Sequence, residues 1–190
     1  MKIVFATNNK HKLSEVRAVL GEGYELVTLA EVGITEDIPE TGDTLDENAS
    51  QKARYVYERT GLDCFADDTG LEVEALNGEP GVRSARYAGE GHDFAANNRK
   101  LLAALDGCSN RRARFRTVIS LIRGGVEQHV EGIVEGHITE SESGSEGFGY
   151  DPLFIPEGHT CTFADMSAEA KNAISHRGRA VAHLVELLKG

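Results

Sequence analysis

Residues 65–71, FADDTGL, carry two adjacent carboxylates, a hydroxyl and a glycine directly after an apolar strand that we predict from Leu62 to Ala66. Carboxylates at the exposed end of a buried strand are costly to pack and useful for chemistry. Asp, Thr and Gly are also ordinary turn residues, and taken alone the stretch favours a β-turn slightly over a site. Because successive strand residues point to opposite faces, Asp67 and Asp68 serve one site equally only if the backbone turns. We predict such a turn at the glycine, with Asp68 and Thr69 aimed to one side.

The composition limits the class of protein. With 190 residues, 40% apolar and 27% charged, the chain fits one soluble domain over residues 1–190, with room for two lobes. The net charge of −11 argues against nucleic-acid binding, although local cations or a metal ion can still hold a small phosphorylated ligand. The three cysteines form no CxxC pair, and no apolar run approaches the length of a membrane span. We therefore expect a cytoplasmic protein with free thiols and no nucleic-acid or membrane partner.

A second polar cluster lies near the N-terminus. Residues 2–6 are typical of a buried strand, and Thr7, Asn8 and Asn9 form a polar turn before a helix expected from about Lys12. Such a loop aims side chains and backbone N–H groups at one point, and the N-terminus of a helix favours an anion there. The alternative is an Asn-capped helix with solvated lysines, and these residues alone leave the two interpretations equal.

A helix further along the chain presents two more polar side chains. Thr44 followed by Glu47 is a capping-box pattern, and it predicts a helix that runs to about Thr60. Asn48 and Lys52 lie four residues apart, side by side on one flank of its apolar face. A lysine beside an apolar face usually extends its ammonium group to water, so a functional role for Lys52 needs support from elsewhere.

The second half of the chain supplies the long strands. Residues 113–122 alternate and then become continuously apolar, a pair of glycines marks a hairpin, and the return strand covers about 126–139. FGYDP at 148–152 precedes a short strand, and SHRG at 175–178 precedes a last helix expected from about Arg179. A single histidine such as His176, just before a helix, is more often a structural residue than a ligand.

Eight short polar motifs follow one another along the chain. They are the loop at 7–12, ETG at 40–42, Asn48 with Lys52, DDTG at 67–70, SARY at 84–87, FGYDP at 148–152, Lys171, and SHRG at 175–178. Each motif is weak alone. Their joint order and spacing, from Thr7 to Gly178, resemble the inosine/xanthosine triphosphate pyrophosphatase family, which clears non-standard purine nucleotides.

The resemblance implies an α/β fold with two lobes. Its long, twisted, mixed central sheet is flanked by helices, and the nucleotide lies in an active-site cleft between the lobes. The resemblance also implies a homodimer and a requirement for Mg²⁺. The implied reaction is hydrolysis of a nucleoside triphosphate such as ITP, dITP or XTP between the α- and β-phosphates, giving the monophosphate and pyrophosphate.

The resemblance also assigns roles residue by residue. Asp68 matches the catalytic carboxylate, which is the candidate proton acceptor, and Glu40 and Asp68 are the expected magnesium ligands, with Asp67 the second choice. The positions that match substrate contacts are Thr7, Asn8, Asn9, Lys10, His11, Lys12, Lys52, Thr69, Phe148, Gly149, Tyr150, Asp151, Lys171, His176 and Arg177. The lysines among them supply cations that the acidic bulk of the chain does not. A few carboxylates with phosphate oxygens and water suffice for magnesium.

Base choice and two alternative functions stay open. A donor such as the Arg177 guanidinium, or a backbone N–H near His176, would favour the 6-oxo group of hypoxanthine or xanthine over the amino group of adenine. Phe148 or Tyr150 would stack on the purine, although core packing is the plainer explanation of both aromatics. The alternatives are a pyrimidine- or modified-nucleotide pyrophosphatase of the septum-inhibitor type, against which SHRG and FGYDP argue, and a non-catalytic nucleotide-binding regulator.

Overall fold

The computed structural model describes residues 1–189. Within them, no helix is long and apolar enough to cross a membrane. The strands are β1 (Lys2–Phe5), β2 (Glu25–Val27), β3 (Cys64–Val73), β4 (Arg112–Arg123), β5 (Val126–Ile138) and β6 (Phe154–Pro156). The α-helices are α1 (Lys10–Leu20), α2 (Leu45–Thr60), α3 (Phe94–Ala104), α4 (Ala168–Ile174) and α5 (His176–Lys189), with short 3-10 helices at Ala30–Val32, Glu74–Leu76, Gly81–Arg86, Asp151–Leu153 and Phe163–Asp165.

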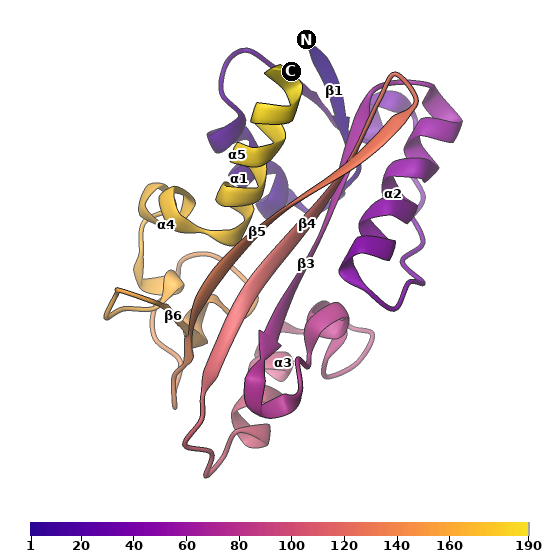
Figure 1. The fold of residues 1–190 in the computed structure, drawn as a ribbon. Coiled ribbons are helices and arrows are strands. Elements are labelled where there is room, and N and C mark those ends of the chain that lie inside the picture. Colours follow the sequence, from indigo (N-terminus) through magenta and orange to yellow (C-terminus); the bar gives the residue numbers. More distant parts are fainter. Residues whose placement is uncertain (190) are drawn as a thin grey trace. The chain divides into compact units, whose positions relative to one another are not determined.

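The strands form one mixed sheet in the order β2-β1-β3-β4-β5-β6 (Figure 1). β1 pairs in parallel with β2 and β3, whereas β5 and β6 are antiparallel. β4 and β5 are joined by Gly124 and Gly125, whose φ angles of 59° and 82° suit a tight hairpin turn that requires two positive φ values. The predicted α/β fold with a long mixed sheet is confirmed. The chain divides into two compact units, and β3, β4 and β5 each contribute residues to both.

β3 is continuous through the stretch where we predicted a turn. Its ten residues run as one strand over Asp67, Asp68, Thr69 and Gly70, so the predicted turn is wrong. The glycine serves a close approach instead, because a Cβ on Gly70 would lie 2.5 Å from the carbonyl oxygen of Gly81. Turn propensity is overruled here, because strand pairing satisfies the backbone groups and the missing side chain leaves room for the neighbouring segment.

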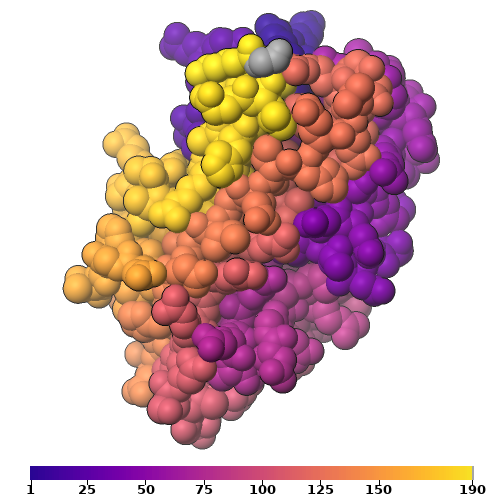
Figure 2. Space-filling model, in the orientation of Figure 1, coloured from indigo at the N-terminus to yellow at the C-terminus, as the bar shows by residue number. Residues whose placement is uncertain are grey.

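The first unit comprises, of the described residues, 1–68, 117–132 and 177–189. One face of its strands carries Phe5 and Phe65, whose rings stack 4.5 Å apart, in a buried cluster with α1 and α5. Figure 2 shows the outer side of α5, in yellow, at the surface beside the hairpin of β4 and β5. The other face carries Cys64 and Ala66, which pack with Ala53 of α2. Since the side chains of β3 alternate, Asp67 falls on the α1 and α5 face and Asp68 on the α2 face.

The second unit comprises residues 69–116 and 133–176. Its buried cluster is centred on Phe115, with Phe154 at 4.7 Å edge to face and Phe163 at 5.9 Å between ring centroids. α3 packs into this cluster through Leu101, and its C-cap residue Leu105 packs there too. Asp93 caps the helix, because its side chain accepts from the Ala96 N–H.

Glu127 of β5 joins α2 to the sheet of the first unit through hydrogen bonds. Its Oε2 accepts from the hydroxyls of Ser50 (2.6 Å) and Ser120 (2.8 Å) and lies 2.9 Å from His129 Nε2, while Oε1 accepts from Arg54 Nε at 2.7 Å. Burial alone would raise the pKa of Glu127, but these hydrogen bonds lower it to about 2. The carboxylate is therefore the ionised centre of a network that ties two helical turns of α2 to the sheet.

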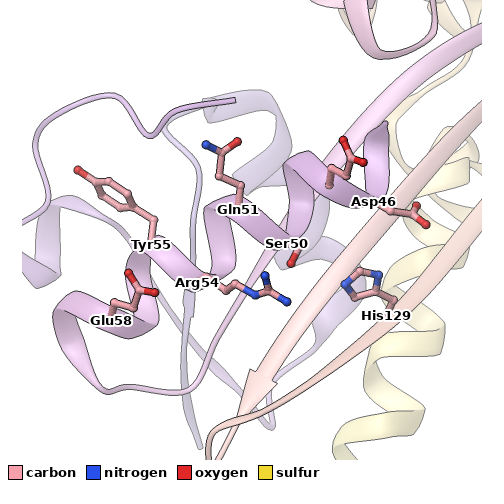
Figure 3. A pocket seen from close by; sticks show the side chains of 8 residues that line it. Asp46, Ser50, Gln51, Arg54, Tyr55, Glu58 and His129 are labelled. Atoms are coloured by element: carbon pink, nitrogen blue, oxygen red, sulfur yellow. The ribbon is translucent and has the colours of Figure 1, made fainter. Parts of the chain in front are cut away.

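Ser50, Arg54 and His129 of this network also line an open groove of about 560 Å³ (Figure 3). The residues that line it are Asp46, Glu47, Ser50, Gln51, Arg54, Tyr55, Glu58 and His129. None of these is a predicted site residue.

Replacing Glu127 with glutamine is expected to destabilise the protein at pH 7 by about 1–2 kcal/mol, because the amide nitrogen would face donors. The pKa of Glu127 lies below its ordinary value of 4.5, so its stabilisation is complete above that pH and is lost as the pH falls towards 2. Urea unfolding between pH 7 and 3 measures the difference. Glu58→Gln, at an exposed position on the same helix, is the control, and equal urea midpoints for wild type and Glu127→Gln at pH 7 would contradict the prediction.

Candidate active site

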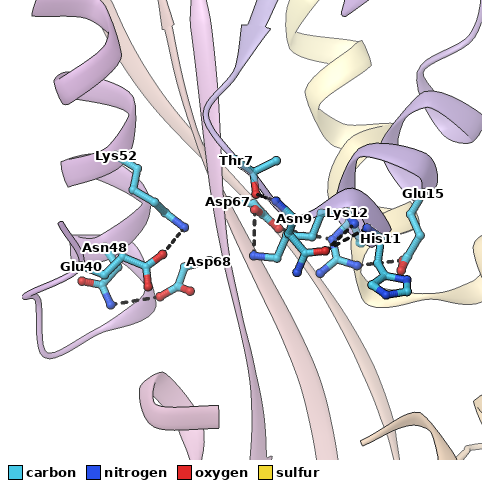
Figure 4. Close-up of polar contacts among 11 residues, drawn as sticks. Thr7, Asn9, His11, Lys12, Glu15, Glu40, Asn48, Lys52, Asp67 and Asp68 are labelled. Atoms are coloured by element: carbon cyan, nitrogen blue, oxygen red, sulfur yellow. Dashed lines mark hydrogen bonds and ion pairs between the residues drawn. The ribbon is translucent and has the colours of Figure 1, made fainter. Parts of the chain in front are cut away.

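Asp67 and Asp68 have different partners because they lie on opposite faces of β3 (Figure 4). Asp67 Oδ1 lies 3.2 Å from Lys12 Nζ of α1, and its Oδ2 accepts from Arg177 Nε of α5 at 3.3 Å. Asp68 Oδ2 accepts from Asn48 Nδ2 of α2 at 3.2 Å. Both carboxylates are buried, with 1% and 7% of their surface exposed. One aspartate thus joins a salt-bridge network, while the other receives a neutral donor.

The pKa values of Asp67 and Asp68 are shifted in opposite directions. Burial alone would raise the pKa of Asp67, but the charges of Lys12, Arg177 and Lys52 outweigh it and hold the pKa well below its usual range. Burial, together with the charge of Glu40, raises the pKa of Asp68 to about 6 against the opposing effect of the two lysines. Neighbouring acids with separated pKa values can take different roles in acid–base chemistry. Asp68 has the properties of a proton acceptor near neutral pH, and Asp67 those of a permanent anion.

Glu40 and Lys52 form the second ion pair of this site, with 2.7 Å between Oε1 and Nζ. Burial would lower the pKa of Lys52, but Glu40, Asp68 and Asp67 raise it overall. Asn48 connects this pair to Asp68, since its Oδ1 accepts from the Gly42 N–H at 2.7 Å while its amide group donates to the aspartate. Figure 4 shows these side chains together between α2 and β3.

α1 begins at Lys10, two residues before the predicted start. Asn9 caps it, because its Oδ1 accepts from the N–H groups of His11 (2.9 Å) and Lys12 (3.2 Å), and the Asn9 N–H donates to Thr7 Oγ1. The Asn cap, which was one of the two alternatives for this loop, is present, and anion binding at the loop stays a prediction. Asn8, Lys10 and His11 are exposed. Burial, with the charges of Lys52 and Arg177, lowers the pKa of Lys12.

α5 begins at His176, three residues before the predicted start, so the last three residues of the SHRG motif lie in its first turn, and Ser175 is the C-cap of α4. Arg177 is among the largest fully buried side chains, and its Nη1 donates to Glu15 Oε2 at 2.8 Å while its Nε contacts Asp67. Gly178 does not interrupt the helix, because an interior glycine costs only about 1 kcal/mol and these buried contacts hold the turn.

The remaining predicted residues lie in the second unit. Asp151 Oδ2 accepts from Lys171 Nζ at 2.7 Å and from the Phe148 N–H at 3.1 Å, and the lysine ammonium lies 5.1 Å from the centre of the Phe148 ring. Tyr150 is a core residue with its hydroxyl donating to the Ser84 carbonyl at 2.6 Å. Phe148 is half-buried, so it is the better placed of the two aromatics for stacking.

His176 and Thr69 complete the set. The His176 ring is buried and stacks on Phe115, with centroids 4.6 Å apart and planes inclined by 16°. Thr69 follows Asp68 on β3 and is half-buried. Within the first unit the fold therefore collects Thr7, the first turn of α1, Glu40, Lys52, Asp68 and Arg177, and within the second it collects Phe148–Asp151, Lys171 and His176.

Two polar residues of the first unit were not among the predicted site residues. Asn48 contacts Asp68, and Glu15 contacts Arg177. The sequence held a signal for Asn48, which lies one helical turn before Lys52 on the same flank. Glu15 has the corresponding signal, because it lies three residues after Lys12 on α1, and residues at that spacing face the same side of a helix.

Gly147 allows the tight approach that holds the FGYDP turn. Its φ is +72°, and an added Cβ would collide with Asp151 Oδ2, the atom that binds the Phe148 N–H and Lys171. Gly147→Ala is therefore expected to destabilise the protein by about 1–3 kcal/mol more than Gly158→Ala, through overpacking alone. Gly158 is the matched control, because its φ is +85° and an added Cβ would have open space. Chemical denaturation of both variants measures the difference. Equal losses of stability would show that the structure around Gly147 adjusts to the added Cβ without cost.

The chain is similar to proteins of one family over its full length. The model of the Ham1 family matches residues 3–187. A dITP/XTP pyrophosphatase of Porphyromonas gingivalis is 58% identical and one of Flavobacterium johnsoniae 53% identical, and each match covers at least 97% of both chains. Among solved structures, the Staphylococcus aureus Ham1 protein superposes with a TM-score of 0.91 at 40% identity, covering 100% of this chain and 99% of that one.

A second solved structure carries an activity in its name. It is a nucleoside-triphosphatase, or dITP/XTP pyrophosphatase, from Mycobacterium abscessus, with a TM-score of 0.79 at 47% identity, covering 97% of this chain and 98% of that one.

Proposed function

Because the chain belongs to the Ham1 family, we propose that it hydrolyses non-standard purine nucleoside triphosphates, namely ITP, dITP and XTP, to the monophosphate and pyrophosphate. It is a hydrolase that acts on a phosphoric anhydride bond. The observation that supports the mechanism is the separation of the pKa values of Asp67 and Asp68. Asp68 accepts the proton of the attacking water, and Asp67 stays ionised to hold Lys12 and Arg177 in place.

The phosphates bind to the first unit. Asn9 Oδ1 already accepts from the N–H groups of His11 and Lys12, so the N-terminus of α1 favours an anion through the helix dipole rather than through those two donors. Lys12 and Lys52 add positive charge that is held in place by Asp67 and Glu40. Phosphoryl transfer depends chiefly on positioning and charge neutralisation, which these groups supply.

Mg²⁺ is the cofactor that this donor set fits. Glu40 and Asp68 are carboxylates close enough for the charge of Glu40 to raise the pKa of Asp68, and a bound cation would offset that repulsion. The residues 1–189 hold no cluster of three or more metal-binding side chains, but Mg²⁺ commonly takes one or two carboxylates together with water and phosphate oxygens. When bound, the ion neutralises charge on the phosphates.

The purine base is recognised by residues of the second unit and of α5. Phe148 stacks on the purine, and a donor at Arg177 or a backbone N–H near His176 meets the 6-oxo group. Arg177 also binds Glu15 and Asp67. Its replacement would therefore disturb both the base site and the fold, so base choice is better tested on substrates than on an Arg177 variant.

The test is product analysis with a panel of ITP, XTP, dTTP, UTP and ATP at saturating Mg²⁺. Release of pyrophosphate from ITP and XTP, with little from ATP, is the expected result. Orthophosphate as the product would refute the cleavage position. Preference for dTTP or UTP would favour a septum-inhibitor type of pyrophosphatase, and binding without turnover would favour a regulator.

We also propose that residues 1–190 act as one pyrophosphatase domain, that the active form is a homodimer, and that it works in the cytoplasm. The uninterrupted family match over residues 3–187 supports the first of these. The resemblance in motif order supports the second, and the three unpaired cysteines support the third. Sedimentation of the purified protein tests the dimer.

A further inference from the structure

α3 carries two residues that contact the FGYDP turn and have no role in the proposed reaction so far. Phe94 and Asn98 lie one helical turn apart, so their side chains share a face of the helix. The Phe94 ring lies 6.0 Å from the Phe148 ring between centroids, at an angle of 46°. Asn98 Nδ2 donates to the carbonyl of Gly149 at 3.2 Å. One face of α3 thus contacts both the stacking ring and the backbone directly after it.

The orientation of the Asn98 amide is determined by its surroundings. The side chain is 3% exposed, and Nδ2 donates to Glu142 Oε1 at 2.9 Å as well as to Gly149. Its Oδ1 has no hydrogen-bond partner within residues 1–189. Turning the amide over would place Oδ1 against a carboxylate and a carbonyl, which repel it. The amide therefore keeps both donors on the loop, although its own oxygen is left unsatisfied, and this fastens Gly149 to α3.

Phe94 is the complementary contact. It is 39% exposed, one of the few large apolar side chains of the described chain at the surface. Two further contacts hold Phe148. Lys171 Nζ lies 5.1 Å from the centroid of its ring, and its N–H donates to Asp151 Oδ2. Phe94 and Lys171 restrict the ring on which a base would stack, whereas the hydrogen bond to Asp151 restricts only the backbone of Phe148.

We propose that Phe94 and Asn98 are positioning residues for purine binding: α3 holds Phe148 in the orientation in which it stacks on the base of an oxopurine nucleoside triphosphate. The inference rests on the proposed function and deepens it. A prearranged ring raises affinity because the ordering of the turn precedes binding. The two residues act through Phe148, so they change the binding of the base more than the hydrolysis step.

Steady-state kinetics with ITP test this inference. Phe94→Ala and Asn98→Asp are each expected to raise KM by about threefold to tenfold, the range for loss of an aromatic pair or a hydrogen bond, with kcat within about twofold of wild type. Phe94→Tyr keeps the ring and is expected to retain the wild-type KM. Arg99→Ala, at an exposed position on α3, is the control. An unchanged KM in both Phe94→Ala and Asn98→Asp would overturn the inference.

A second measurement separates this inference from the proposed function. The chain has no tryptophan, so Phe148→Trp places a single tryptophan at the stacking position, and its emission lies at longer wavelength than that of the tyrosines. Adding Phe94→Ala or Asn98→Asp to this variant is expected to shift its emission to longer wavelength and to increase quenching by acrylamide, whereas adding Arg99→Ala does neither. If wild type leaves ITP intact, the proposed function fails, yet the emission still reports on the positioning. Unchanged emission in the Phe94→Ala and Asn98→Asp backgrounds would overturn it.

Discussion

Replacing Asp68 with asparagine is expected to lower kcat for ITP by about a thousandfold, within the range that a positioned general base contributes. The amide has nearly the same shape and can still accept the hydrogen bond from Asn48, but it cannot take a proton from water. Pyrophosphate release at saturating Mg²⁺ and saturating ITP measures the loss. Full turnover in this variant would refute the role of Asp68.

The same substitution is expected to stabilise the metal-free protein at pH 7 by about 3 kcal/mol. The folded pKa of Asp68 is about 6, above its ordinary value of 3.8. Its contribution to stability is therefore present below pH 3.8 and is lost as the pH rises through 6, and asparagine avoids that loss. Urea unfolding from pH 4 to 7 measures the gain in the free energy of unfolding, which should nearly disappear as the pH approaches 4.

Asp67→Asn is the matched control, one residue away, and its effect on stability is expected to have the opposite sign. The pKa of Asp67 is lowered by Lys12, Arg177 and Lys52, so its stabilisation is present above pH 3.8 and is lost only as the pH falls below that value. The asparagine would leave Lys12 and Arg177 without this partner in a buried place. Equal stability changes in the two variants at pH 7 would contradict the assignment of separate roles.

Replacing Lys171 with methionine is expected to destabilise the protein by about 3–5 kcal/mol, the loss typical of breaking a buried ion pair on one side. The side chains of Lys171 and Asp151 are only 6% and 4% exposed, and their charged atoms are 2.7 Å apart. Removing the ammonium leaves the Asp151 carboxylate buried with the Phe148 N–H as a remaining donor. Urea or thermal unfolding of the metal-free protein measures the loss.

A double variant separates the uncompensated charge from the lost packing. Lys171→Met with Asp151→Asn removes both charges and keeps an acceptor for Phe148, so we expect part of the stability to return. Lys189→Met, at a side chain that is 63% exposed and pairs with Glu186 on the surface, is the control and should change little. A loss in Lys171→Met no larger than in Lys189→Met would show that the pair contributes nothing to the fold.

Much of the local structure could be predicted because its signals are short in range. α2 is capped by Thr44, whose side chain accepts from the Glu47 N–H, and it ends at Gly61 in a left-handed conformation. The hairpin turns at the predicted glycine pair. Caps and tight turns depend on a few neighbouring residues, so the sequence predicts them well.

Three predictions of local structure failed, two of them where tertiary contacts decide. β3 continues through residues 67–70 because neighbouring strands pair with it, and α5 begins at His176 because buried contacts of its first turn hold the helix. α1 begins at Lys10 because Asn9 caps it, a signal we noted but placed two residues too late. Pairing and burial involve residues distant in the chain, and a local pattern does not contain them.

The sequence by itself determined the element types, the caps, the hairpin and, through the order of its motifs, the chemical class of the site. It also ranked Asp68 above Asp67. Only the tertiary structure decided how the surroundings of the two carboxylates differ. Because side chains alternate along an unbroken β3, Asp67 contacts the cations of α1 and α5, and Asp68 contacts the amide of Asn48. The Asp67 carboxylate is therefore held ionised, whereas the pKa of Asp68 is raised towards neutral pH. A pKa depends on the charges and burial around a group, and those are set by residues far away in the sequence.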